Sequence, residues 1–80
     1  MINRTLNYTV IIHKAEEGGY VGFVPFLPGC MTQGETLDEV RSNIKDAIEG
    51  YLFVLKEDNE SIPVEKEHPI SANISVALPA

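Results

Sequence analysis

The sequence predicts an α+β domain in which four short strands form one sheet and a single long helix packs on one of its faces. Two kinds of pattern support this prediction. Alternating apolar residues near the start and near the end of the chain are typical of strands. Between them, a stretch of about 21 residues has helical periodicity and begins with a helix-capping pattern. The predicted element order is therefore β-β-β-α-β in two layers.

Length and composition limit the chain to one folded domain, residues 1–80. Hydrophobic residues make up 44% of the 80 residues, which is enough for one small core. Twelve acidic and six basic residues give a net charge of −6, which repels nucleic acid phosphates and attracts basic proteins. The single cysteine cannot form an internal disulfide, and no N-terminal apolar run suits a signal peptide or a membrane span. We expect a cytoplasmic protein with a protein partner, without a cofactor and without membrane association.

The first two strands are predicted to be antiparallel neighbours. Within residues 6–14, Leu6, Tyr8, Val10 and Ile12 occupy alternate positions, which is the period of a half-buried strand. Ile11 is expected on the opposite face of this strand. The Gly18–Gly19 pair then supplies the positive φ angles that a tight hairpin needs, and the second strand runs over Tyr20–Pro25.

The segment VPFLPGC, residues 24–30, is predicted to end the second strand in a turn. Its two prolines lack the N–H group that a sheet ladder requires, and Gly29 permits a conformation closed to other residues. A short third strand follows over Cys30–Gln33 and stops at Gly34. These three strands form an antiparallel meander.

The long helix is predicted to begin after Thr36. Thr36 is the expected N-cap, and Glu39 is its capping-box partner three residues later. Apolar residues recur at steps of three and four and form a stripe that covers one face of the sheet. The stripe consists of Leu37, Val40, Ile44, Ala47, Ile48, Tyr51, Leu52 and Leu55. Phe53 lies beside this stripe, where it serves either as additional core or as an oligomer contact.

A fourth strand is predicted over residues 73–78, after a polar connection that contains two prolines. Ile74, Val76 and Leu78 alternate there with smaller or polar residues. A right-handed return from the helix would lay this strand parallel to the first strand, so the expected spatial order is 3-2-1-4.

The predicted sheet has one face without a helix and edge strands without charged residues to protect them. Such edges and faces are paired or covered in soluble proteins. We therefore expect a homodimer or a higher homo-oligomer, with Phe53 and Ile11 as candidate interface residues.

One stretch of the chain carries a specific pattern of residue types. A Gly-Tyr strand leads into VPFLPGC and then into T-x-G-x-T-x-x-E at fixed spacing. The matching residues are Gly19, Tyr20, Val24, Pro25, Leu27, Pro28, Gly29, Cys30, Thr32, Gly34, Thr36 and Glu39. Over residues 8 to about 55 the chain resembles the HicB-like antitoxin family, which implies a partial ribonuclease H fold. The glycines, the prolines, Cys30 and the capping pair are assigned structural roles.

The resemblance implies an antitoxin that sequesters and inhibits a small, basic mRNA endoribonuclease toxin of the HicA type. The candidate contacts with this partner are Tyr20, Phe26, Leu27 and Pro28, although a core position is favoured for Leu27. Phe26 stands where the family commonly has an acidic residue. The family often has a C-terminal DNA-binding domain, and no such domain is expected here, so we expect no direct DNA binding. The alternative is a HicB-like oligomeric scaffold or small-ligand-binding domain without a toxin.

We expect no enzymatic activity and no metal site. Ribonuclease H chemistry needs several carboxylates around two metal ions, but the first strand has no Asp or Glu, and Asn73 and Ser75 are the polar residues of the fourth. Cys30 has no histidine partner at a recognisable spacing and is interpreted as a small buried hydrophobic residue. His13 and His68 match no metal-ligand spacing.

Overall fold

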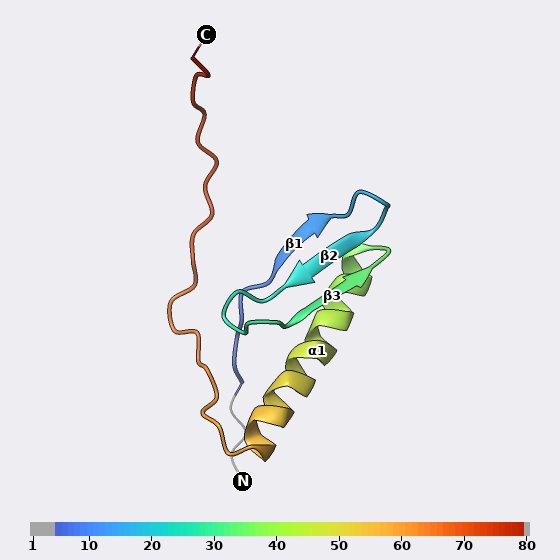
Figure 1. The fold of residues 1–80 in the computed structure, drawn as a ribbon, viewed down its shortest axis with the longest axis vertical. Helices are drawn as coiled ribbons and strands as arrows, with labels where there is room; N and C mark the ends of the chain where they lie inside the picture. Colours follow the sequence, from blue (N-terminus) through green and yellow to red (C-terminus); the bar gives the residue numbers. More distant parts are fainter. Residues whose placement is uncertain (1–4, 80) are drawn as a thin grey trace.

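The computed structural model describes residues 5–79, which form a two-layer α+β fold. Three strands, β1 (Ile11–Lys14), β2 (Tyr20–Phe23) and β3 (Met31–Gly34), form an antiparallel sheet in the order β1-β2-β3. One helix, α1 (Leu37–Glu57), packs on one face of this sheet (Figure 1). The predicted meander and the single long helix are confirmed.

The strands are shorter than the sequence predicted because β2 ends early. Ile11 pairs with Phe23, the last residue of β2. Pro25 then ends the pairing, so residues 6–10 face no strand on that side within the described sheet. Only the last four residues of the predicted first strand therefore form β1, and β3 begins one residue later than predicted.

The turn between β2 and β3 is closed by backbone hydrogen bonds. The N–H groups of Val24, Leu27 and Cys30 donate to the carbonyls of Cys30, Val24 and Leu27, each at 3.0 Å. Gly29 has a φ of 85°, a conformation that favours glycine. This turn buries Leu27 completely, in a core that includes Val24, Cys30 and Ile44. Leu27 is therefore a core residue, which is the interpretation that the sequence favoured over a partner contact.

The helix begins where the sequence predicted, with Thr36 as its N-cap. The Thr36 hydroxyl accepts a hydrogen bond from the N–H of Glu39 at 3.1 Å. The Glu39 carboxylate accepts from the N–H of Glu35 at 3.2 Å, one residue before the position expected for a capping box. It still lies at the positive end of the helix dipole. Within residues 5–79, no helix contains an apolar stretch of the length that a membrane span requires.

α1 lies over β2 and β3 rather than over the whole sheet. Among the described elements it packs against β3 and β2 but not against β1. The side-chain amide of Asn43 donates to the carbonyl of Gln33 at 2.9 Å and ties the helix to β3. Gly22 permits a close approach, because a Cβ atom there would lie 2.8 Å from Cγ1 of Val40. The side of β1 that faces the helix is consequently only half covered.

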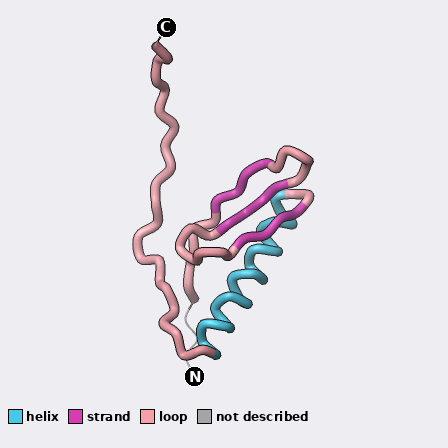
Figure 2. Tube along the Cα trace, viewed as in Figure 1, coloured by secondary structure: helices cyan, strands magenta, loops and turns pink. Residues whose placement is uncertain are grey.

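The predicted fourth strand is not formed in the part of the chain that the structure describes. Residues 73–78 are exposed and form no strand, so the predicted order 3-2-1-4 is observed only for its first three strands. Figure 2 shows the segment after α1 as a loop that extends past the sheet. A strand needs a neighbour with which to pair, and the chain leads these residues away from the edge of β1.

Candidate protein-binding surface

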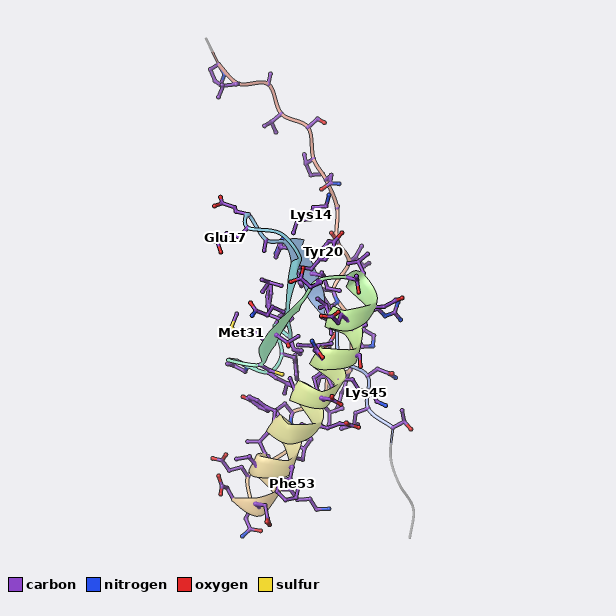
Figure 3. All side chains as sticks on the ribbon, turned by 90° about the vertical axis from the view of Figure 1, so that its right-hand side faces the viewer. Lys14, Glu17, Tyr20, Met31, Lys45 and Phe53 are labelled. Atoms are coloured by element: carbon purple, nitrogen blue, oxygen red, sulfur yellow. The ribbon has the colours of Figure 1, made fainter. Side chains whose placement is uncertain are left out.

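The face of the sheet opposite α1 carries an apolar row. The pairing of Phe23 with both Ile11 and Met31 places these three residues side by side across β1, β2 and β3. The ring of His13 stacks on Phe23, with the ring centroids 5.9 Å apart. Met31 is 60% exposed and lies on the side of the sheet away from α1 (Figure 3). A contiguous apolar row on a sheet face is typical of a protein contact surface.

A shallow acidic hollow lies at the end of the sheet near the β1–β2 turn. Its lining consists of Ala15, Glu17, Gly18, Tyr20, Gln33, Gly34, Glu35 and Glu39. The turn comes close to the end of β3 because Gly19, with a φ of 74°, has no side chain, and a Cβ there would lie 2.7 Å from the Gly34 carbonyl oxygen. Three carboxylates beside the ring of Tyr20 favour the binding of Lys and Arg side chains.

The opposite end of the sheet carries the β2–β3 turn. Phe26 is 44% exposed at this turn, and the hydroxyl of Tyr51 donates to the carbonyl of Pro28 at 2.9 Å. That bond fastens the turn to α1. The structure thus separates the four predicted partner contacts: Tyr20 lies at the acidic end, Phe26 and Pro28 lie at the turn, and Leu27 is inside the core.

The two candidate interface residues lie on different faces of the molecule. Ile11 belongs to the apolar row, whereas Phe53 is exposed on the outer side of α1 (Figure 3). Sequence reasoning did not single out Phe23 or Met31, because their alignment with Ile11 depends on strand register. The available signal was Met31 itself, a large apolar residue in an otherwise polar strand.

A cluster that we call the clasp joins residues far apart in the sequence. The Glu65 carboxylate accepts the N–H of Thr9 at 2.9 Å and the hydroxyl of Thr9 at 2.5 Å, and Nδ1 of His68 lies 2.6 Å from it. The Tyr8 hydroxyl donates to the carbonyl of Pro63. The Glu65 side chain is only 4% exposed. Hydrogen bonding from Thr9 lowers the pKa of Glu65 below its ordinary value.

The remaining chemically reactive groups are placed for packing or for surface contacts. Cys30 is buried, and this burial raises the pKa of its thiol, which disfavours the nucleophilic thiolate. His13 stacks on an aromatic ring, and His68 belongs to the clasp. Within residues 5–79, no group of three or more His, Cys, Asp or Glu side chains is placed to hold a metal ion.

The chain is similar to a known protein family and to several proteins of bacteria and archaea. Residues 8–76 match a family described as the HicB_like antitoxin of bacterial toxin-antitoxin system. A UPF0150 protein of Thermoplasma acidophilum is 50% identical over 68 residues, 85% of this chain and 99% of that protein. A UPF0150 protein of Archaeoglobus fulgidus is 48% identical over 62 residues, 75% of this chain and 90% of that protein. Antitoxin HicB 1 of Photorhabdus laumondii is 36% identical over 63 residues, 79% of this chain and 41% of that protein.

Proposed function

The chain belongs to the HicB-like antitoxin family, and from this premise we propose that it binds and inhibits a small, basic mRNA endoribonuclease of the HicA type. Family membership supports an antitoxin role and implies a toxin partner. The observation that carries the proposed binding surface is the apolar row on the sheet face opposite α1. The acidic hollow lies at the other end of the strands, at the β1–β2 turn. In this proposal the protein acts by binding, and the pair works in the cytoplasm, where mRNA is the toxin's substrate.

The two parts of this surface have different physical roles. A toxin that binds the phosphates of mRNA needs basic side chains, and the hollow beside Tyr20 offers these side chains three carboxylates instead. Long-range attraction to a chain of net charge −6 speeds the encounter. Burial of the row Ile11, Phe23 and Met31 then slows dissociation, because a few well-packed residues near the centre of an interface carry most of its binding energy.

Co-expression with a small basic open reading frame beside the gene tests the proposal directly. The tagged chain should retain that protein on an affinity column and protect mRNA from it. Met31→Lys should weaken binding by at least about tenfold, since it places a positive charge in an apolar contact with a basic partner. Val54→Lys is the matched control, because Val54 is also an exposed apolar residue, at 55%, but lies on α1.

Each result bears on a different part of the proposal. Failure of the wild-type chain to bind or inhibit the basic protein would contradict the antitoxin function. Equal binding by Met31→Lys and wild type, or a loss confined to Val54→Lys, would contradict the assigned surface. Charge reversal in the hollow by Glu17→Lys should lower the association rate most strongly at low salt, because salt screens exposed charges.

A further inference from the structure

The C-terminal arm, residues 70–79, has the pattern of a strand with one buried face, although it lies in solvent. Ile70, Ala72, Ile74, Val76 and Leu78 occupy successive even positions of this arm. The odd positions 71, 73 and 75 are serine or asparagine. Ile74, Val76 and Leu78 are 80%, 85% and 93% exposed. This period of two predicts that the even positions face an apolar surface once the arm is paired.

An open apolar groove lies between residues 5–12 and α1. It exists because α1 packs over β2 and β3, which leaves the helix-facing side chains before and within β1 half covered. Its apolar lining is Leu6, Val10, Ile12, Ile44, Ile48 and Leu52. β1 is also an edge strand of the described sheet, so its outer edge offers N–H and C=O groups for pairing. This edge begins where Ile12 lines the end of the groove. Groove and edge together offer an added strand both backbone partners and an apolar floor.

The clasp directs the arm away from the body of its own molecule. Pro63 and Glu65 are held beside Tyr8 and Thr9, and Pro69 lies near the β2–β3 turn. From there the arm extends past the sheet (Figures 1 and 2). The radius of gyration is 15.9 Å, whereas a compact chain of this length would have about 12 Å. With the clasp closed, the arm is placed to reach a neighbouring molecule.

We propose that two copies of this chain exchange their arms. The arm of each copy pairs with the free edge of β1 in the other copy and inserts Ile74, Val76 and Leu78 into its groove. Each sheet thereby gains a fourth strand beside β1, supplied by the partner. The contact is reciprocal, so it closes as a symmetric dimer. It uses the α1 side of the sheet and leaves the apolar row on the other face free for a toxin.

The mass of the whole chain in solution tests the exchange without any toxin. Light scattering at micromolar concentration should give twice the 8.8 kDa chain mass. Val76→Asp should return the mass to that of one chain, because it places a charge in the groove, whereas Ser75→Asp should leave the dimer intact. Both residues are exposed in the single chain, so circular dichroism should show the same fold in both variants. A wild-type monomer at every concentration, or a Val76→Asp dimer of undiminished mass, overturns the proposal.

Disulfide trapping identifies which groove receives the arm. Lys45 lines the groove and is exposed on α1 (Figure 3). The Lys45→Cys variant is therefore mixed with a second variant that carries a cysteine at one of positions 74 to 78. A bridge requires Cα atoms within about 7 Å. Links between the two copies at positions 74, 76 or 78, but not at 75 or 77, support the exchange. A chain with both cysteines that closes only on itself shows the arm in its own groove and overturns the exchange.

Discussion

Replacing Gly22 with alanine is expected to destabilise the protein, because α1 packs directly over this residue. The added Cβ would lie 2.8 Å from Cγ1 of Val40 and 3.6 Å from Cγ1 of both Ile12 and Val10. Val40 is completely buried, and a β-branched residue has one strongly preferred rotamer in a helix. The Val40 side chain therefore cannot turn away from the new methyl group. The helix must shift outward from β2 to make room.

Two opposing contributions set the size of this effect. Alanine is more favourable than glycine inside a strand by about 0.5–1 kcal/mol. Forcing an extra methyl group into a packed core costs about 1–3 kcal/mol. The two ranges leave a net loss of up to about 2.5 kcal/mol, and we expect about 1 kcal/mol, near the middle of that range. For a domain of this size each kcal/mol lowers the melting temperature by about 4–8 °C.

Thermal and urea unfolding followed by circular dichroism measure this loss, at one fixed protein concentration because self-association changes apparent stability. Gly50→Ala is the matched control: nothing lies within 4 Å of a Cβ at this helical position, so stability should rise by up to about 1 kcal/mol. In a Val40→Ala background the Gly22→Ala penalty should disappear, since its steric cause is gone. A Gly22→Ala protein that melts at or above the wild-type temperature would refute the close packing of α1 on β2.

Two further predictions concern the core and the clasp. Ile44→Ala should lower the free energy of unfolding by roughly 2–5 kcal/mol, since Ile44 is buried against the turn. A melting temperature within a degree or two of wild type would show that this face of α1 does not form the core. The pKa of Glu65 is lower in the folded chain than its ordinary value of 4.5. The contribution of the clasp to folding stability is therefore complete above pH 4.5 and is lost as the pH falls through the pKa of the folded chain. The protection factor of the Thr9 amide, which is its exchange rate corrected for the intrinsic effect of pH, should therefore fall in acid and should already be low near neutral pH in Glu65→Gln. A protection factor that does not change in either case would contradict the clasp.

Local patterns were sufficient for most of the fold. The prolines and Gly29 predicted the turn after β2, and Thr36 with Glu39 predicted the start of α1, because turns and caps depend on residues close together in the sequence. The same patterns placed Ile11 on the face without a helix. They could not align it with Phe23 and Met31, since that alignment comes from the register of two strand pairs.

The predicted fourth strand shows that a local pattern is not sufficient to predict strand pairing. Residues 73–78 alternate as a strand, but pairing needs a free edge within reach, and the clasp turns them away from their own β1. The clasp itself joins Thr9 to Glu65 across 56 positions, a distance over which no periodicity carries information.

Short-range patterns were enough to predict the first three strands, the helix and its start, the turn and the family, because each depends on local backbone preferences or on a linear motif. Three features could be seen only in the folded chain: α1 lies over β2 and β3, Val40 packs closely on Gly22, and a groove stays open next to Ile12 of β1. These features arise from the packing of side chains against distant segments. Their positions therefore follow from the volume and shape of the assembled layers rather than from any single stretch of the chain.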